Sequence, residues 1–352
     1  MENIIKKKSL IKVILNIILL LIPIGFIIYF LTSENGMINL IESAATFSWQ
    51  WIIFGVICHL SNIAADAFAL YTLTKNYSKN YTYRQSLKCT AIGQFFSVVT
   101  PAAAGSQPMQ LYCLKRQNVD TGVASSIIIQ KFLVYQSTIT LYSLVAVICN
   151  FDIFNNGNSE LMITLAALGF FSHAFVISLM YFLSFNQKVT SKLMKAIYTF
   201  LSKIKIIKNP EEKLKDLEVK LKNFYDANVY LYKNKKSLFK VAGATVVQLT
   251  LSFVVSYTIY RAFNFNSVNA FDMITGQAFI TMVSSFMPLP AGAGAAEGSF
   301  YVFFEAFFTP NTIKSAILIW RIISYLLTIV VCAPFIRIPN ATTDKTGKEN
   351  LK

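Results

Sequence analysis

Long apolar runs follow one another along most of this chain, separated by short polar stretches. A helix of about 20 apolar residues matches the hydrocarbon core of a bilayer, which is roughly 30 Å thick. Six runs reach that length: 12–31, 52–74, 122–149, 161–184, 238–262 and 314–336. Each is expected to cross a membrane once, and the first is expected to be retained as a helix rather than cleaved. The pattern predicts an all-α polytopic integral membrane protein.

Two further apolar stretches, 86–115 and 273–308, are interrupted near the middle. The first contains "TPAAAGSQP" (100–108) and the second "MPLPAGAGAAEG" (287–298). Each flanking half has about 12–15 residues, which is too short to cross a bilayer alone. We therefore expect two re-entrant helical hairpins, each of which enters and leaves the membrane on the same side.

The basic residues predict the orientation of these segments. The net charge is +15, and 28 of the 32 lysines and arginines fall on one side of the predicted arrangement. The predicted outer loops, 32–51, 150–160 and 263–272, contain none. This asymmetry predicts a multi-pass protein of the cell membrane with both termini in the cytoplasm. The charge is explained by topology and by attraction to anionic inner-leaflet lipids, so no nucleic-acid partner is expected.

With this orientation, the two hairpins open to opposite sides of the membrane. A span, a hairpin and a span between 52 and 149 form one unit, and the same order between 238 and 336 forms a second, inverted unit. Inverted repeats commonly place a substrate site between two broken elements near the bilayer midplane. The chain divides accordingly into membrane halves 1–184 and 238–338, with a polar cytoplasmic tail at 339–352.

A lysine-rich cytoplasmic linker, 185–237, joins the two halves. The stretch 191–208 alternates lysines with apolar residues at helical spacing, which is typical of a basic amphipathic helix on a membrane surface. The stretch 210–236 begins with Pro and Glu, as helices often do, and has one apolar face. That face consists of Leu214, Leu217, Leu221 and Phe224. A solvated helical hairpin is the alternative interpretation, and it is compatible with lipid contact.

The two breaks predict an internal polar cleft. Broken helices expose backbone groups that hydrocarbon cannot satisfy, so they occur where protein buries them or where they line a wet cavity. The half-helix after each break also presents free N–H groups that suit an anionic headgroup. The residues expected to form the cleft are Thr100, Pro101, Gly105, Pro288, Pro290, Gly292 and Gly294. A purely structural plug is the alternative.

Ionisable residues within apolar spans are costly and usually functional. Lys131 lies near the middle of its span, Arg321 is about eight residues into the last span, and Glu297 follows the second break. We expect these three to meet between the halves, where the cations would hold a phosphate and Glu297 would balance their charge. The full set of substrate-binding candidates is Lys131, Glu297, Arg321, Gln107, Gln130 and Asp66. A structural ion-pair cluster that locks the halves together is the alternative.

Known catalytic motifs are absent from the sequence, and its longest polar stretch, about 50 residues, is too short for a catalytic domain. His59 and His173 are expected to be hydrogen-bonded packing residues. The five cysteines are scattered, without a C-x-x-C pair, and are expected to be buried apolar residues. No metal or other cofactor is predicted.

At the two breaks, the sequence resembles the lysylphosphatidylglycerol synthase transmembrane region family, also called flippase-like membrane proteins. The stretch 93–136 is similar to its first signature, a Thr-Pro, small residues, a basic stretch and a span with a mid-depth cation. "FMPLPAGAGAAEGSF" (286–300) resembles the second signature, and Arg321 matches the last. Ser106 and Gln107 stand where a glycine pair is common, and Lys131 stands where arginine is usual. Lysine lacks the bidentate fork of arginine, so a different headgroup is one expectation here.

The resemblance implies a lipid translocator that moves an anionic or aminoacylated phospholipid, such as lysyl-phosphatidylglycerol, between leaflets. In bifunctional members this activity gives resistance to cationic antimicrobial peptides. Those members also carry a C-terminal aminoacyl-transferase domain, and lysyl transfer by such a domain is not expected here. Two alternatives stay open: a membrane subunit of a phosphatidylglycerol lysyltransferase, and a lipid-binding scaffold that transports nothing. The partners expected are phospholipid headgroups, with a separate aminoacyl-lipid synthase and a homo-oligomer left open.

Overall fold

The computed structural model describes residues 45–100, 103–150, 159–203, 210–284 and 294–336, and every regular element in these ranges is helical. Within these ranges, five helical segments are long and apolar enough to cross a membrane. They are α3 (Trp49–Thr74), α6 (Thr121–Cys149), Ala167–Phe185 within α7 (Ser159–Phe185), α10 (Lys235–Ala262) and Ile313–Ile336. These segments confirm five of the six predicted spans and the all-α membrane fold, while the run 12–31 lies outside the described residues.

The last span is not a uniform α-helix. It begins as α13 (Ile313–Arg321), passes through a π-helical turn, η2 (Ile322–Leu326), and continues as α14 (Leu327–Cys332) and a 3₁₀ turn, η3 (Ala333–Ile336). π-Helical turns are rare and are often found at functional sites. This turn directly follows Arg321.

Each interrupted stretch folds as two short helices that pack against each other. The first pair is α4 (Tyr83–Val99) and α5 (Ser106–Arg116), and the second is α11 (Ala270–Ser284) and α12 (Ala295–Phe304). The helices of the first pair approach closely at a glycine, since a Cβ on Gly93 would lie 2.3 Å from Gln110 Nε2. The entry and exit of either pair on one side of the membrane stay predictions.

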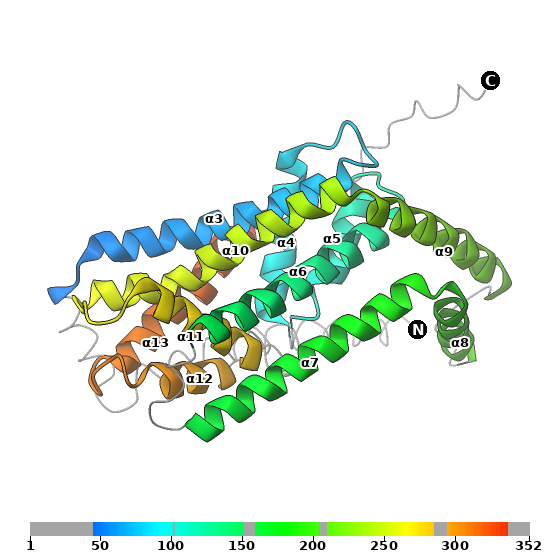
Figure 1. Ribbon diagram of the computed structural model, residues 1–352. Coiled ribbons are helices and arrows are strands. Elements are labelled where there is room, and N and C mark those ends of the chain that lie inside the picture. Colours follow the sequence, from blue (N-terminus) through cyan, green and yellow to red (C-terminus); the bar gives the residue numbers. More distant parts are fainter. Residues whose placement is uncertain (1–44, 101–102, 151–158, 204–209, 285–293, 337–352) are drawn as a thin grey trace, which may run out of the picture.

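The two predicted repeat units meet through α3 and α10, which lie side by side along their length (Figure 1). The helices are antiparallel. Ser48 N donates to Ala262 O at 3.0 Å at one end, and Asn76 Nδ2 donates to Ser237 Oγ at 2.9 Å at the other. Each unit therefore begins with a central span, continues with a pair of short helices and ends with a second span. This is the element order expected for an inverted repeat.

Two large apolar cores lie in the protein, one centred on each unit, and each also includes a residue of the other unit's central span, Val241 and Cys58. Leu70, Ile92, Leu114 and Ile127 are buried together from α3, α4, α5 and α6. A second core, between α10, α12 and α13, includes the buried residues Tyr260, Phe300, Phe304 and Ile317. The two cores hold each short-helix pair against the long helices, which positions the residues at the helix breaks.

Aromatic–cation contacts occur at both ends of the long helices. The Arg261 guanidinium lies 5.0 Å from the ring centre of Trp51 at one end, and Lys75 Nζ lies 4.9 Å from that of Tyr71 at the other. Such pairs are typical of the two interfaces of a bilayer. Trp51 and Lys75 are 24 residues apart on or beside α3, which corresponds to about 36 Å at 1.5 Å per residue. This spacing suits a membrane-crossing helix.

The linker consists of α8 (Gln187–Lys203) and α9 (Pro210–Lys233). The helix predicted to begin at Pro210 is confirmed, and two residues of its expected apolar face, Leu217 and Phe224, are buried. α9 packs against α6, and Leu231 is also fully buried. α9 is therefore part of the packed bundle and differs in this respect from a solvated connection.

The contact between α6 and α9 depends on a glycine. A Cβ on Gly122 would lie 2.4 Å from the backbone oxygen of Lys220 and 2.9 Å from the backbone nitrogen of Phe224. Gly122→Ala is expected to force the helices apart and to cost about 1–3 kcal/mol, because a backbone cannot rotate away as a side chain can. The measurement is the melting temperature of the purified protein in detergent, which should fall.

Gly243→Ala is the matched control, since a Cβ there meets nothing within 4 Å and the residue lies inside α10. Alanine is better than glycine in a helix interior by up to about 1 kcal/mol. This variant should melt at or above the wild-type temperature. Equal melting temperatures for the two variants would contradict the close α6–α9 approach.

Candidate functional site

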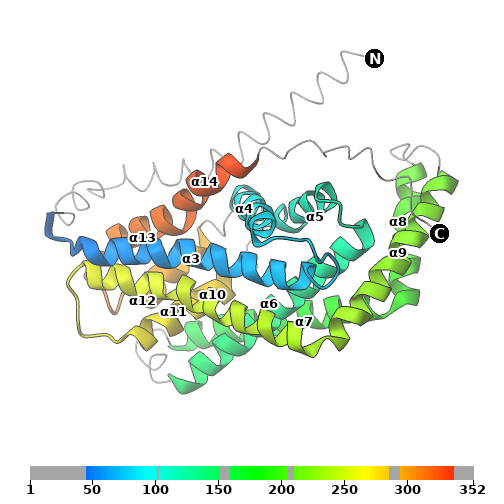
Figure 2. The ribbon, with the colours of Figure 1, turned by 90° about the horizontal axis from the view of Figure 1, so that it is seen from above.

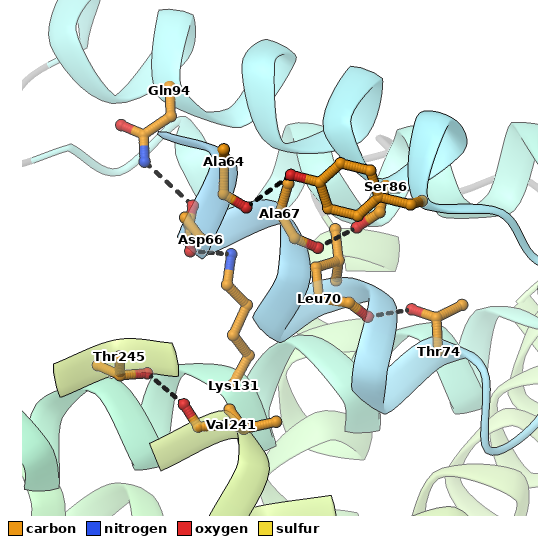
Figure 3. A network of polar contacts seen from close by, with 11 residues as sticks. Ala64, Asp66, Ala67, Leu70, Thr74, Ser86, Gln94, Lys131, Val241 and Thr245 are labelled. Atoms are coloured by element: carbon orange, nitrogen blue, oxygen red, sulfur yellow. Dashed lines mark hydrogen bonds and ion pairs between the residues drawn. The ribbon is translucent and has the colours of Figure 1, made fainter. Parts of the chain in front are cut away.

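A buried ion pair joins α3 to α6. Lys131 Nζ lies 2.7 Å from Asp66 Oδ1, and their side chains are only 12% and 6% exposed. Gln94 of α4 donates from Nε2 to the other carboxylate oxygen, Asp66 Oδ2, at 3.1 Å. Figure 3 shows Lys131 extending from α6 toward Asp66, and Gln94 contacting Asp66 from the opposite side. Three helices of the first unit thus meet at one carboxylate.

Local hydrogen bonds hold α4 in this position. The helix begins at a capping box in which Thr82 N donates to Gln85 Oε1 at 2.8 Å. Ser86 Oγ then donates to Ala67 O at 2.6 Å, beside Asp66 on α3 (Figure 3). Because the start of α4 is fixed to α3 in this way, Gln94 is directed toward the carboxylate.

The Asp66–Lys131 pair leaves donor capacity for a ligand. An ammonium group has three N–H donors, and Asp66 is the one hydrogen-bonding or ion-pair partner of Lys131 among the described residues. Both Asp66 oxygens already accept one donor each. The pair can therefore bind an additional anionic group at Lys131, and each Asp66 oxygen, which has a second lone pair, can accept one further donor.

The first helix break is closed by its own threonine. Thr100 Oγ1 donates to Phe96 O at 2.5 Å and accepts from Gly105 N at 2.8 Å. A Cβ on Gly105 would lie 2.8 Å from Thr100 Cγ2, so the close turn requires glycine. Gln107 is partly buried in the first turn of α5 and has no hydrogen-bond partner among the described residues. Pro101 lies outside the described residues.

A second buried ion pair lies in the other unit. Arg321 Nε lies 2.5 Å from Glu297 Oε1, and the two side chains are 9% and 7% exposed. Glu297 Oε2 accepts the backbone N–H of Gly294 at 2.7 Å, so the carboxylate also caps the start of α12. The Arg321 guanidinium lies 4.9 Å from the ring centre of Trp320.

Glycine at position 294 allows the backbone to adopt this arrangement. Its φ of +85° lies in the region that residues with a side chain rarely adopt. The chain can therefore turn into α12 with the N–H of Gly294 directed at Glu297. The other expected cleft residues of this break, Pro288, Pro290 and Gly292, lie outside the described residues.

The two ion pairs lie at different depths. α3 and the last span run in the same direction, because Gly55 lies beside Ile323 and His59 Nε2 lies 2.8 Å from Thr328 Oγ1. Asp66 comes seven residues after His59, and Arg321 comes seven residues before Thr328. At 1.5 Å per residue the pairs are roughly 20 Å apart along the helix axes.

The expected meeting of Lys131 with Glu297 and Arg321 is therefore wrong in one respect. Glu297 and Arg321 do contact each other, but Lys131 has Asp66 as its carboxylate partner. Each unit balances its own buried cation, because an unpaired charge in either apolar core would be costly. Asp66, which was not expected in this cluster from the sequence, is thus the partner of Lys131.

Gln130 points away from the Asp66 pair. Its Nε2 donates to Asn228 Oδ1 on α9, and Asn228 Nδ2 donates to Ser184 O on α7 at 2.9 Å. These buried bonds tie α9 to α6 and α7, which is a structural role. Asn228 and Gln94 had no distinctive sequence signal, whereas the buried bond between His59 and Thr328 agrees with the expectation that His59 is a hydrogen-bonded packing residue. The described residues contain no group of three or more His, Cys, Asp or Glu side chains that could hold a metal ion.

Comparison with known proteins places the chain in a family. Residues 13–332 match the family model described as the lysylphosphatidylglycerol synthase TM region. A UPF0104 membrane protein of Archaeoglobus fulgidus is 21% identical over 311 residues, covering 88% of this chain and 91% of the relative. An uncharacterized protein of Mycoplasma genitalium is also 21% identical, over 329 residues that cover 88% of this chain and 84% of the relative. With its family match across nearly the whole length, the chain belongs to the lysylphosphatidylglycerol synthase transmembrane-region family.

Proposed function

We propose that the protein is a lipid translocator of the cell membrane that moves an anionic or aminoacylated phospholipid, such as lysyl-phosphatidylglycerol, between leaflets. The observation that carries this proposal is the presence of one buried carboxylate–cation pair in each unit, at different depths along α3 and the last span. Charged residues within membrane spans are costly and usually mark a polar pathway. The family membership agrees with a lipid substrate.

The chemistry of the pairs suits a headgroup that carries both charges. A lipid phosphate would bind the Lys131 ammonium or the Arg321 guanidinium, and an amine would bind Asp66 or Glu297. Where one phosphate and one amine bind in this way, one ion pair is replaced by two, and these four charges are balanced in the apolar interior. The acyl chains would stay in the surrounding lipid.

Movement between the two depths would follow alternating access. In inverted repeats, one unit rocks against the other around a site between them. Here the units meet at α3 and α10, and the His59–Thr328 bond crosses between them at a depth between the two ion pairs. The distribution of basic residues supports cytoplasmic termini, and hence a path from the Asp66 pair on the inner side to the Glu297 pair on the outer side.

A second candidate is a membrane subunit that works with a phosphatidylglycerol lysyltransferase. The description of the matching family as part of a synthase favours it. In that case the protein would bind the lipid without moving it by itself, and a separate enzyme would supply the lysyl transfer. If the protein is a scaffold that only binds lipid, the isolated protein would likewise bind the lipid without moving it.

The test is a transport assay with the purified protein. Liposomes containing fluorescent phosphatidylglycerol or its lysyl derivative are prepared with and without the protein, and headgroup accessibility is followed with a membrane-impermeant quencher. A translocator exposes inner-leaflet lipid faster than empty liposomes do. If the rate equals that of empty liposomes for both lipids, the translocator proposal is rejected in favour of the subunit or the scaffold.

A further inference from the structure

α8 lies across the direction of the membrane spans. Figure 1 shows α8 nearly end-on, whereas Figure 2 shows it from the side, at the end of the bundle where α3 ends and α10 begins. The chain turns between α7 and α8 at Asn186, whose Oδ1 accepts the backbone N–H of Val189 at 3.2 Å. Thr190 Oγ1 also donates back to Leu183 O at 2.5 Å, which fixes the turn.

The surface of α8 has three distinct faces. Met194 and Tyr198 are partly buried toward the rest of the molecule. Lysines occupy a second, exposed face, with Lys188 and Lys192 free of ion pairs among the described residues. The third face is apolar and exposed at helical spacing: Val189 39%, Leu193 46%, Ile197 42% and Phe200 62%.

We propose that α8 lies in the plane of the membrane surface and binds anionic phospholipids there. A helix with a continuous apolar stripe beside a lysine face is the form that sits at the boundary of headgroups and acyl chains. Val189, Leu193, Ile197 and Phe200 enter that boundary, and Lys188 and Lys192 bind lipid phosphates. The position of α8 at the end of α7, and its direction across the spans, bring the apolar stripe to this depth.

The surface binding of α8 extends to the bundle through α9. Lys195 Nζ lies 2.7 Å from Glu218 Oε1, which links the two linker helices on their exposed sides. α9 in turn is fixed to α6 by its buried residues and by the Gln130–Asn228 bond. α8 thus anchors α9 to the bilayer, and α9 packs against α6, the span that carries Lys131.

The test measures the depth of spin labels on α8 in vesicles. The exposed Cys149 is changed to serine, and the four other native cysteines are buried. Single cysteines are then introduced at Ile197 and Phe200 on the apolar stripe and at Thr199, an exposed position on the polar side, as the matched control. Collision of each label with oxygen, which partitions into lipid, is compared with collision with a water-soluble nickel complex.

In vesicles of phosphatidylcholine and phosphatidylglycerol, the labels at 197 and 200 should collide severalfold more with oxygen than with nickel, and the label at 199 should show the reverse. Lys188→Gln and Lys192→Gln should each lower the ratio of membrane-bound to unbound α8, as reported by these labels, about fivefold. Vesicles of phosphatidylcholine alone should weaken the membrane binding of α8 by a similar factor.

Collision with nickel at 197 and 200 in mixed vesicles would overturn the proposal. Labels at 197 and 200 that are shielded from both reagents would overturn it in favour of a second protein molecule on this face. Equal membrane binding of α8 in vesicles with and without phosphatidylglycerol would overturn the proposed selectivity for anionic lipid.

Discussion

Glu297→Ala is expected to destabilise the protein by about 3–5 kcal/mol, because it removes the carboxylate partner of a buried guanidinium. Arg321 and Glu297 are 9% and 7% exposed, so water cannot replace the lost partner fully. The substitution also removes the carboxylate that caps the Gly294 N–H at the start of α12. Thermal unfolding in detergent, followed by the fluorescence of Trp320 and the other tryptophans, measures the loss.

The control is the double variant Glu297→Gln/Arg321→Gln. It keeps polar side chains at both positions but leaves no charge unbalanced, so it should recover a large part of the lost stability. Asp216→Ala provides a second comparison, since its ion pair with Lys220 is exposed and should contribute less than about 1 kcal/mol. If Glu297→Ala melts like Asp216→Ala, the second pair does not hold the protein together as described.

Lys131→Gln is expected to lower the rate of lipid translocation at least 30-fold, roughly the equivalent of 2 kcal/mol in headgroup binding. Lys131 is the cation with free donors beside Asp66, and its loss removes the group that would hold the phosphate. The vesicle assay with a membrane-impermeant quencher measures the rate, and size-exclusion profiles verify that the variant is folded.

Two further variants make this result interpretable. Lys131→Arg keeps the charge and should retain most of the rate, with a shift in preference among headgroups because arginine binds phosphate in a bidentate manner. Lys240→Gln removes an exposed lysine of α10 and should transport like the wild type. A folded Lys131→Gln protein with the wild-type rate would remove Lys131 from the pathway.

The long elements could be predicted from the sequence because their signal is local. A run such as 238–262 needs only its own apolar residues to be identified as a span, and α10 covers it. The start of α9 at Pro210 is similarly local. The helix breaks were visible because proline and glycine are rare within apolar runs, and Thr100 and Gly105 close the first break through bonds only five residues apart.

The pairing of the charges could not be predicted in this way. Asp66 and Lys131 are 65 residues apart, and nothing in the sequence around Lys131 distinguishes Asp66 from Glu297 as its partner. The choice depends on how α3, α4 and α6 pack. The π-helical turn after Arg321 and the Gln130–Asn228 bond also arise from tertiary packing, which explains why Gln130 was predicted to bind substrate and is found to join helices.

In the proposed mechanism, the buried Asp66–Lys131 pair of the first unit acts in lipid movement and not only in folding. The most direct measurement is the translocation rate of Asp66→Asn/Lys131→Gln in vesicles, because this double variant leaves no unpaired charge. We predict a folded protein, melting within a few degrees of the wild type, whose rate is indistinguishable from that of empty liposomes. A folded double variant that moves lipid at the wild-type rate would contradict the claim and assign the pair a structural role alone.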